Sequence, residues 1–466
     1  MKMALIGGGG VRTVFFCQSL AKYADRLGIT ELRLMDNDAE KLNMFGRLAQ
    51  FAVSQSSNLK ITLTESIEEA VSAVDYVVTA LRVGGDAGRV KDERVALSLG
   101  VLGQETTGAG GFSYAMRTIP VLKEYMRIIN EKSNHATVFN FTNPAGLVTQ
   151  ALHLAGYHNT IGICDNATGT KMNLAQALNV DARDLFVRVY GLNHLTWADS
   201  ITVRGAEIFP QLMANEQFIQ NYHDFLYYDR DLVRKLNALP NGYLYYYYHR
   251  ERALANILAA KQTRGESILA LNREMVKKLC AVDIEKNPQR ALDIYLATMD
   301  ARNATYMATE LGGKAAVKIP LDIESLGIDA LKGAKGQMEV LEGYAGVALN
   351  YIEAQRNNRK TDLAINVPNN GAISFLRADD IIEVSCMIDA NGANPVKIDH
   401  VPEDNMLLMQ QVKRYERLAC DAIQNKSFDM AVMALMANPL VESFSLAKQL
   451  MEGYKKAHAE FLTDWK

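Results

Sequence analysis

The chain has 466 residues, of which 48% are hydrophobic and 22% are charged, and its formal net charge is -3. This composition is typical of globular proteins, and the charge excludes any general attraction to nucleic acid or to an anionic membrane. The length exceeds what one hydrophobic core usually serves, so we expect two domains. The five cysteines are few and odd in number, which predicts a reducing, cytoplasmic location without a disulfide framework.

The N-terminal part of the chain alternates short apolar runs with segments of helical periodicity. The expected strands are 2–6, 31–35, 60–64, 75–80, 137–141 and 159–164, and the expected helices are 13–23, 38–54, 114–132 and 144–156. Strands that alternate with helices predict an α/β fold with a parallel, doubly wound sheet.

The pattern changes after residue 164. An antiparallel strand pair is expected at 185–190 and 196–204, around the turn Gly191-Leu192-Asn193-His194. The remainder mixes expected helices with two expected strands: helices at 250–280, 287–310, 335–356, 404–425, 429–436 and 442–462, and strands near 372–376 and 381–388. We therefore expect one domain over 1–192 and a mixed α+β domain over 193–466.

A glycine cluster stands between the first strand and the first helix. Its residues are Gly7, Gly8, Gly9, Gly10, Val11 and Arg12. Glycine allows backbone N–H groups to approach a pyrophosphate closely, which predicts a dinucleotide site. Asp36 ends the second strand, where a carboxylate binds ribose hydroxyls and favours NAD over NADP. The alternative is a purely structural glycine turn in another doubly wound fold.

Cys164 and His194 are a candidate pair of metal ligands. Cys164 ends the sixth strand, at the edge of the sheet where ligands bind in such folds. A thiolate and an imidazole suit Mn, Fe, Co, Ni or Zn, and two protein ligands leave coordination positions for a substrate. The alternative is a cysteine of the core and a histidine that is only hydrogen-bonded in a turn.

Polar residues at the same edge extend this candidate site. Asn143 follows the fifth strand and is expected either to bind substrate hydroxyls or to cap the helix after Pro144. Asp165 follows Cys164 and is a candidate general acid. The charged run from Arg89 to Arg94 is either a solvated helix face or a border of the site that holds an anion.

Residues 243–248 contain five tyrosines in six positions, which indicates packing or a subunit interface for most of them. A tyrosine acts as a base only where nearby positive charge lowers its pKa from about 10, and a metal ion supplies such charge.

Together these segments resemble glycoside hydrolase family 4, the NAD- and metal-dependent glycosidases, and look closest to its 6-phospho-β-glucosidase branch. The matching stretches are 6–13, Arg82-Val83-Gly84-Gly85, Lys91-Asp92-Glu93-Arg94, Gly103-Gln104-Glu105-Thr106, 140–146, Gly162-Ile163-Cys164, Gly191-Leu192-Asn193-His194 and 369–373. The resemblance implies a lactate-dehydrogenase-like Rossmann domain that binds NAD and a second domain of mixed α/β structure.

The resemblance also implies residue roles. It assigns Cys164 and His194 to a metal ion, usually Mn2+, Asn143 to substrate hydroxyls and Asp165 to the acid. It places the base in the tyrosine run, where we favour Tyr243, with Tyr245 and Tyr246 as rivals. Arg89 and Arg94 are the candidates from the charged run for holding an anionic substrate.

The implied reaction is net hydrolysis. NAD+ takes a hydride from C3 of the sugar, the metal-acidified C2 proton is removed, the aglycone leaves from C1, water adds, and the hydride returns. The expected partner is a small glycoside, with no nucleic acid and no membrane, and we expect a homodimer or homotetramer.

Two departures from the branch keep alternatives open. The branch has an arginine in an Arg-Gly-Gly-Ala-Tyr-Tyr-Ser stretch, whereas the nearest segment, 341–346, has Glu342 and no arginine. Asp165 also stands where the phospho-β branch usually has asparagine, and aspartate is commoner in α-acting members. A glycosidase for unphosphorylated or α-linked sugars is therefore an alternative. A 2-hydroxy-acid or polyol dehydrogenase and a nucleotide-sensing regulator are further ones.

Overall fold

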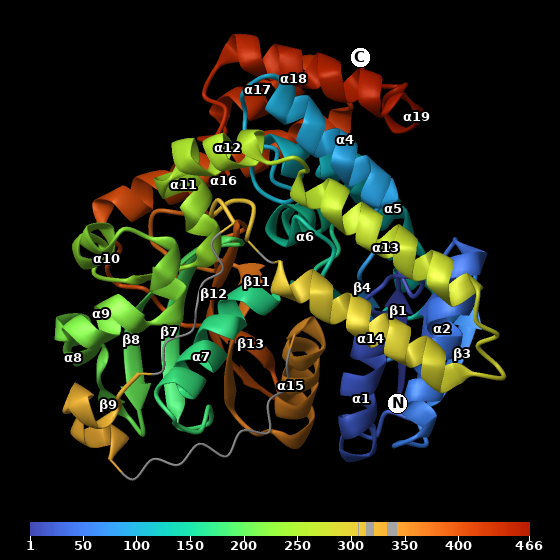
Figure 1. Cartoon of the computed structure of the whole chain (residues 1–466), viewed down its shortest axis with the longest axis horizontal. Helices are drawn as coiled ribbons and strands as arrows, with labels where there is room; N and C mark the ends of the chain where they lie inside the picture. The colour runs from blue at the N-terminus through green and yellow to red at the C-terminus, as the bar shows by residue number, and fades with distance from the viewer. Residues whose placement is uncertain (306, 314–320, 333–342) are drawn as a thin grey trace. The chain divides into compact units, whose positions relative to one another are not determined.

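The structure, a computed structural model, describes residues 1–305, 307–313, 321–332 and 343–466 (Figure 1). The chain forms two compact units, each assembled from separated segments. Unit 1 comprises Met1–Gly162, Leu254–Gly312 and Arg414–Lys466, and unit 2 comprises Ile163–Ala253 and Gly313–Lys413. The domain division at residues 192 and 193 remains a prediction, because the compact units follow a different grouping of segments.

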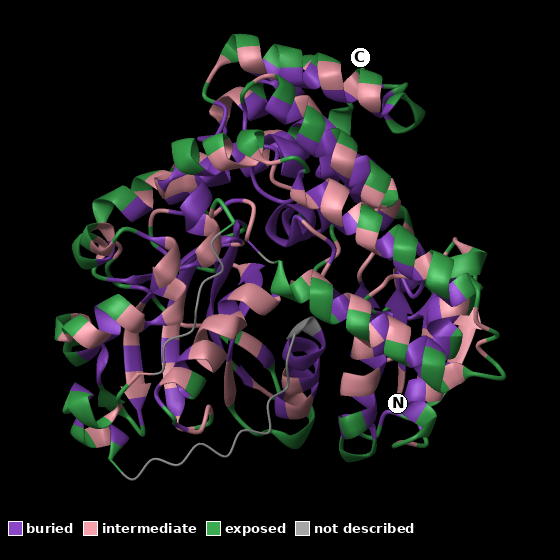
Figure 2. Ribbon diagram, in the orientation of Figure 1, coloured by how far each residue is buried: buried purple, intermediate pink, exposed green. Residues whose placement is uncertain are grey.

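Unit 1 contains a parallel sheet in the order β3-β2-β1-β4-β5-β6. Its strands are β1 (Lys2–Ile6), β2 (Glu31–Met35), β3 (Lys60–Thr64), β4 (Tyr76–Thr79), β5 (Thr137–Asn140) and β6 (Thr160–Gly162). The order reverses between β1 and β4, which is the Rossmann arrangement. The expected α/β fold with a Rossmann domain is thereby confirmed. Strands β1 and β4 are almost entirely buried, as their apolar runs predict for the middle of a parallel sheet (Figure 2).

Four helices of the first part of the chain agree with the sequence pattern, and three further helices were not expected. The helices up to residue 177 are α1 (Thr13–Leu27), α2 (Ala39–Ser54), α3 (Ile67–Val71), α4 (Gly85–Ser98), α5 (Gly108–Lys132), α6 (Ala145–Leu154) and α7 (Asp165–Ala177). The charged run 89–94 lies on α4, and α7 begins directly after Cys164. Both helices present mixed polar faces, so their periodicity is weak in the sequence.

The single helix expected at 250–280 is two helices, α12 (Arg250–Ala259) and α13 (Arg264–Cys280). The break falls at Thr263, whose side chain accepts from the Glu266 backbone while the Glu266 side chain accepts from the Thr263 backbone. This capping box starts a new helix and explains why the pattern is not continuous. In unit 1, α13 packs against α4 and α14 (Pro288–Ala304).

Unit 2 contains two sets of antiparallel strands. One consists of β11 (Thr361–Pro368), β12 (Ile381–Asp389) and β13 (Gly392–Pro395), and the other of β7 (Leu185–Leu192), β8 (Leu195–Val203), β9 (Ala206–Glu207) and β10 (Leu239–Pro240). The prediction of a strand at 372–376 is wrong. The strand that pairs with β12 is β11, and residues 369–380 form the connection between the two. That connection is fixed by Asn369, whose amide bonds backbone groups across it, so its apolar residues are buried without being a strand.

The remaining elements are short helices of residues 209–248 and longer helices toward the C-terminus. They are α8 (Phe209–Ala214), α9 (Glu216–Asn221), η1 (His223–Tyr227), α10 (Arg230–Leu236), η2 (Gly242–Leu244), α11 (Tyr245–Tyr248), η3 (Glu324–Leu326), η4 (Asp329–Leu331), α15 (Gly343–Asn357), α16 (Glu403–Asn425), α17 (Phe428–Ala437), α18 (Phe444–Ala457) and α19 (Ala459–Leu462). Within the described residues, no helix combines the length and apolar character needed to cross a membrane.

Candidate active site

The glycine cluster forms a tight loop between β1 and α1 in unit 1. The N–H groups of Gly7 and Gly8 donate to the Met35 carbonyl, and the Gly9 N–H donates to Asp36 Oδ2 at 2.9 Å. A Cβ atom on Gly7 would lie 2.6 Å from the Ala80 carbonyl oxygen, and the φ of this residue is +97°. The loop therefore requires glycine, and the Asp36 carboxylate lies at the loop, where a bound ribose is expected.

Asn143 follows β5 in a loop that buried side chains hold in place. The Asn140 amide, which is fully buried, donates to the Thr142 and Ala145 carbonyls and to the Thr149 hydroxyl. Helix α6 starts with Pro144 as its N-cap residue, so Asn143 is not the cap. Among the described residues, the Asn143 side chain makes one hydrogen bond, a long one of 3.4 Å that it accepts from the Ala145 N–H. This arrangement leaves the amide of Asn143 suited to a ligand.

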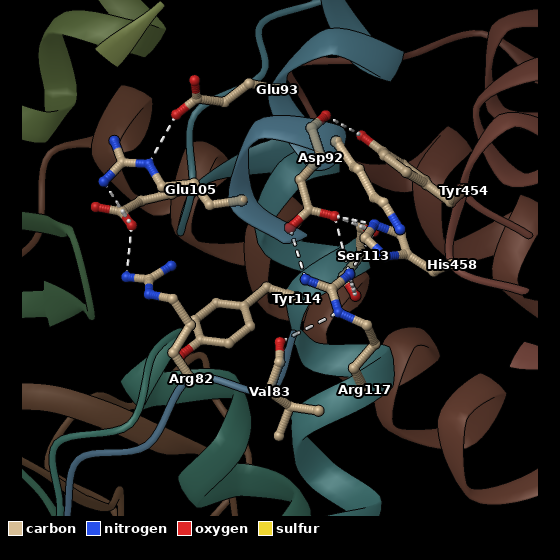
Figure 3. Close-up of polar contacts among 12 residues, drawn as sticks. Arg82, Val83, Asp92, Glu93, Glu105, Ser113, Tyr114, Arg117, Tyr454 and His458 are labelled. Carbon is tan, nitrogen blue, oxygen red and sulfur yellow. Dashed lines mark hydrogen bonds and ion pairs between the residues drawn. The ribbon is translucent and has the colours of Figure 1, made fainter. Parts of the chain in front are cut away.

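A buried group of charges lies on α4 and the loops beside it (Figure 3). Glu105 accepts from Arg82 at 2.6 Å and is 3.0 Å from Arg89, and Arg89 also bonds Glu93 at 2.8 Å. Burial alone raises the pKa of Glu105, but the guanidinium groups of Arg89, Arg82 and Arg302 outweigh it and lower that pKa to about 2. Glu105 is therefore a stable carboxylate that holds two arginines in place.

Arg94, the other predicted arginine of this run, lies at the surface. Its guanidinium makes two hydrogen bonds to Glu266, at 2.8 and 2.5 Å, at the start of α13. Half of its side chain is exposed. This bidentate pair favours a structural role for Arg94, and only Arg89 of the two stays a substrate-binding candidate.

Arg302 adds a positive charge that its surroundings do not neutralise. Burial and the charges of Arg12 and Arg89 lower its pKa, against the attraction of Glu105 and Asp86, to about 10. Its Nη1 atom is buried and has no hydrogen-bond partner among the described residues. A buried guanidinium donor close to Arg12, at the end of the glycine loop, is an arrangement that favours binding of an anion.

Helix α14 fixes this guanidinium relative to the glycine loop. The Tyr295 hydroxyl, on the same helix, donates to the Val11 carbonyl at 2.8 Å. Arg302 lies two turns further along α14, and its own carbonyl accepts from Arg264 at 3.0 Å. The rings of Phe15 and Phe45 pack against Tyr295, which is fully buried, and this packing fixes the position of α14 relative to the loop.

A second buried group of charges centres on Asp92 (Figure 3). Its carboxylate accepts two hydrogen bonds from Arg117, at 2.9 and 2.7 Å, one from Ser113 at 2.6 Å, and one from His458 at 2.7 Å. Burial alone raises the pKa of Asp92, but the hydrogen bonds from His458 and Arg117 outweigh it and lower that pKa. This group joins α4, α5 and the end of α18.

In unit 2 the structure brings Cys164 and His194 together, as predicted. The Sγ atom of Cys164 lies 3.4 Å from Nε2 of His194, and both residues are buried. Two ligands at tetrahedral positions on one ion, with bonds of about 2.3 and 2.0 Å, have a sulfur-to-nitrogen distance of roughly 3.5 Å. The pair therefore fits a shared divalent metal ion. Within the described part of the chain no third His, Cys, Asp or Glu completes a ligand set, so further positions are left for a substrate.

The backbone presents both side chains at element ends. Cys164 is the N-cap residue of α7, and its sulfur accepts from the Asn166 N–H at 3.5 Å. His194 lies in the two-residue turn between β7 and β8 with a φ of +62°, a value that is uncommon for a residue with a Cβ atom. Such backbone strain is often found at functional sites. Burial raises the pKa of the Cys164 thiol, and the charges of Glu383 and Asp165 raise it further. A cation is therefore needed to favour the thiolate.

Tyr243 is the tyrosine of the run that contacts this pair. Its ring stacks on the His194 ring, with centroids 3.9 Å apart and planes within 2°. Tyr245 and Tyr246 are buried in an aromatic cluster that includes His249, and Tyr248 bonds the Trp197 indole through its hydroxyl. Burial raises the pKa of Tyr248 to about 12, which disfavours it as a base.

Three residues of these sites carry no role in the sequence interpretation: Arg302, Glu105 and Glu383. Arg302 could have been found, because Arg302 and Tyr306 have the spacing of the first arginine and first tyrosine in Arg-Gly-Gly-Ala-Tyr-Tyr-Ser. The segment considered instead includes Glu342, which lies outside the described residues. The signal for Glu383 is a lone acid in the apolar run of β12.

Comparisons with known proteins agree with this set of features. The sequence matches the family described as "Family 4 glycosyl hydrolase" over residues 2–180 and its C-terminal domain over residues 189–441. It is 30% identical to the 6-phospho-beta-glucosidase of Escherichia coli (strain K12), over 100% of this chain and 97% of that protein. It is 27% identical to the maltose-6'-phosphate glucosidase of Bacillus subtilis (strain 168), over 98% of this chain and 96% of that protein. The 6-phospho-beta glucosidase from Thermotoga maritima, solved with manganese, NAD+ and glucose-6-phosphate, superposes with a TM-score of 0.79 at 25% identity, over 99% of both chains.

Proposed function

Because the chain belongs to family 4 of the glycosyl hydrolases, we propose that it is an NAD+- and divalent-metal-dependent glycosidase that cleaves 6-phospho-β-glucosides. The observation that carries the proposal is the Cys164–His194 pair, whose 3.4 Å separation fits one metal ion and whose imidazole stacks on Tyr243. A relative named for this activity and a solved structure that holds manganese, NAD+ and glucose-6-phosphate support it.

The residues divide between binding and proton transfer. Cys164 and His194 hold the metal, preferably Mn2+, and the loop from Gly7 to Arg12 holds the NAD+ pyrophosphate, with Asp36 at the adenosine ribose. Asn143 bonds the sugar hydroxyls, since the structure gives its amide only one long contact. When bound, NAD+ accepts a hydride from C3 and later returns it, while the metal ion makes the C2 proton acidic.

Proton transfer then falls to two side chains. Tyr243, ionised to the phenolate, removes the C2 proton and becomes the neutral phenol, because the ring is fixed against His194 beside the metal position and a cation there would lower the tyrosine pKa. Asp165, half-buried at the first turn of α7 next to Cys164, gives a proton to the glycosidic oxygen as the aglycone leaves. Addition of water and return of the hydride complete the hydrolysis.

The 6-phosphate is supported by the arginines of unit 1. The buried Nη1 atom of Arg302 has no hydrogen-bond partner among the described residues, and Arg302 lies close to Arg12 and Arg89, so this region carries more positive charge than its carboxylates neutralise. A dianionic phosphate removes that excess. We expect Arg302→Gln to lower kcat/KM for 6-phosphorylated substrates by about 10- to 100-fold, as for loss of a charged hydrogen bond. Activity on unphosphorylated analogues is expected to change little, and Arg94→Gln serves as the surface control.

An α-specific enzyme is the second candidate. Asp165 favours it, because aspartate after the metal cysteine is commoner among the α-acting members that this chain resembles. The relative named as a maltose-6'-phosphate glucosidase is similar over nearly the whole chain, at 27% identity.

A panel of α- and β-nitrophenyl glucosides, each with and without 6-phosphate, tests these proposals. The assay contains NAD+ and Mn2+ under reducing conditions. We expect hydrolysis of the 6-phospho-β-glucoside only with both cofactors, no net NADH, and slower cleavage of a C2-deuterated substrate. Net NADH formation supports a dehydrogenase instead, and hydrolysis of only α-linked or only unphosphorylated substrates rejects the stated specificity.

A cytoplasmic location and a homodimeric or homotetrameric state complete the proposal. All five cysteines are free, four of them buried, which suits a reducing compartment. Light scattering after size exclusion measures the oligomeric state directly.

A further inference from the structure

Glu383 is a buried acid in the middle of β12 whose presence packing does not explain. Its exposed fraction is 0%, and its neighbours along the strand are apolar. It faces Asn366, its register partner on β11, which is also fully buried. Burying a carboxylate costs several kcal/mol unless its surroundings compensate it, so a core position of this kind calls for another reason.

The carboxylate binds the turn that carries His194, one of the two metal-ligand candidates. Its Oε1 atom accepts from the Asn193 amide at 3.2 Å and from the Asn366 amide at 2.9 Å. Glu383 thus holds the side chain of Asn193, which directly precedes His194 in the strained turn.

The hydrogen bonds of Glu383 are incomplete. Its Oε2 atom and the Oδ1 atom of Asn366 are both buried, and neither has a hydrogen-bond partner among the residues that the structure describes. A carboxylate serving only to brace the turn would be expected to have both oxygens satisfied. Hydrogen bonding among the described residues therefore does not by itself account for this carboxyl group.

We propose that Glu383 is a positioning residue for metal binding: it shapes the Asn193–His194 turn and places a negative charge behind Cys164 and His194. This inference rests on the proposed function. A thiolate and a neutral imidazole bring one negative charge to a divalent ion, and the buried carboxylate brings the second. Outer partners of this kind typically change metal affinity 10- to 100-fold.

Glu383→Gln separates the two effects, because glutamine keeps an oxygen that accepts from Asn193 and Asn366 and removes the charge. We expect the Kd for Mn2+, measured by electron paramagnetic resonance on metal-free protein, to rise by about 10- to 100-fold. The unfolding temperature of the metal-free protein is expected to stay the same or rise, since an incompletely paired buried charge is gone. Asp184→Asn is the control, because Asp184 pairs with Arg204 at the far end of the β7–β8 hairpin.

Two results overturn the inference. One is an unchanged Mn2+ affinity of the Glu383→Gln variant. The other is a lower unfolding temperature of the metal-free variant, because that result indicates that Glu383 only stabilises the turn. If Glu383→Gln does not fold, Glu383→Asp replaces it. Aspartate keeps the charge, but its side chain is one methylene shorter and moves the carboxylate away from the turn. We therefore expect weaker Mn2+ binding and an altered resonance of the bound ion. A Kd and a spectrum like those of the wild type reject the inference. Cys164→Ser tests the proposed function separately: if it binds Mn2+ like the wild type, the metal site itself is misplaced.

Discussion

The buried charge group around Asp92 provides a quantitative test of what holds unit 1 together. Asp92→Asn keeps the size of the side chain but removes the charge that Arg117 and His458 share. The Arg117 side chain is 1% exposed and the His458 side chain is 0% exposed, so water cannot replace the lost partner. Asparagine also presents an NH2 group to donors that already point at this position.

The expected loss follows from this burial. Removing one partner of a buried ion pair costs about 3–5 kcal/mol. The entropy of unfolding is about 2.1 cal/mol/K per residue, which gives about 1 kcal/mol/K for 466 residues unfolding as one. The unfolding temperature should therefore fall by about 3–5 °C, and by more if unit 1 unfolds alone.

Differential scanning calorimetry at several pH values measures this difference. Because the folded pKa of Asp92 is lowered, its contribution is complete above the ordinary Asp pKa of about 4 and is lost as the pH falls through the folded value. The gap between wild type and Asp92→Asn should be full at pH 7 and shrink below about pH 4. Glu131→Gln, which breaks an exposed pair with Arg127, should cost less than about 1 kcal/mol. Equal shifts for both variants at pH 7 would refute the reasoning.

Three further predictions concern the proposed sites. Tyr243→Phe should lower kcat by about 100-fold or more, as for loss of a general base, whereas Tyr246→Phe, inside the aromatic cluster, should retain most activity; equal losses would reject Tyr243 as the base. Asp36→Asn should weaken NAD+ binding in calorimetric titration by about tenfold and improve NADP+ relative to NAD+, and an unchanged cofactor ratio contradicts the ribose assignment. Gly7→Ala should lower the free energy of unfolding, measured with denaturant, by more than Gly28→Ala. Both glycines have a positive φ, but only at Gly7 does a carbonyl oxygen, that of Ala80, lie 2.6 Å from the new Cβ atom. Similar losses for the two variants argue against this close approach.

The sequence determined the parallel sheet, the glycine loop and the identity of the candidate metal ligands. Each depends on local information: apolar runs of strand length, glycines that a tight turn requires, and a cysteine at a strand end. The Cys164–His194 contact was also predictable, because the motifs around both residues point to one site and only their distance was missing. The strand β11 escaped detection because Asn366 interrupts its apolar pattern.

Only the tertiary structure decided which charged residues stand alone and which are paired. The sequence does not distinguish Arg89, Arg94 and Arg302. In the structure Arg94 is bound to Glu266 and Arg89 pairs with two carboxylates, whereas a buried donor of Arg302 has no partner within the described residues. Glu383 likewise becomes notable only when it lies beside Asn193 and His194, far away in the chain. Charge compensation in a protein interior depends on distance and burial, and both arise from contacts between segments that no local pattern records.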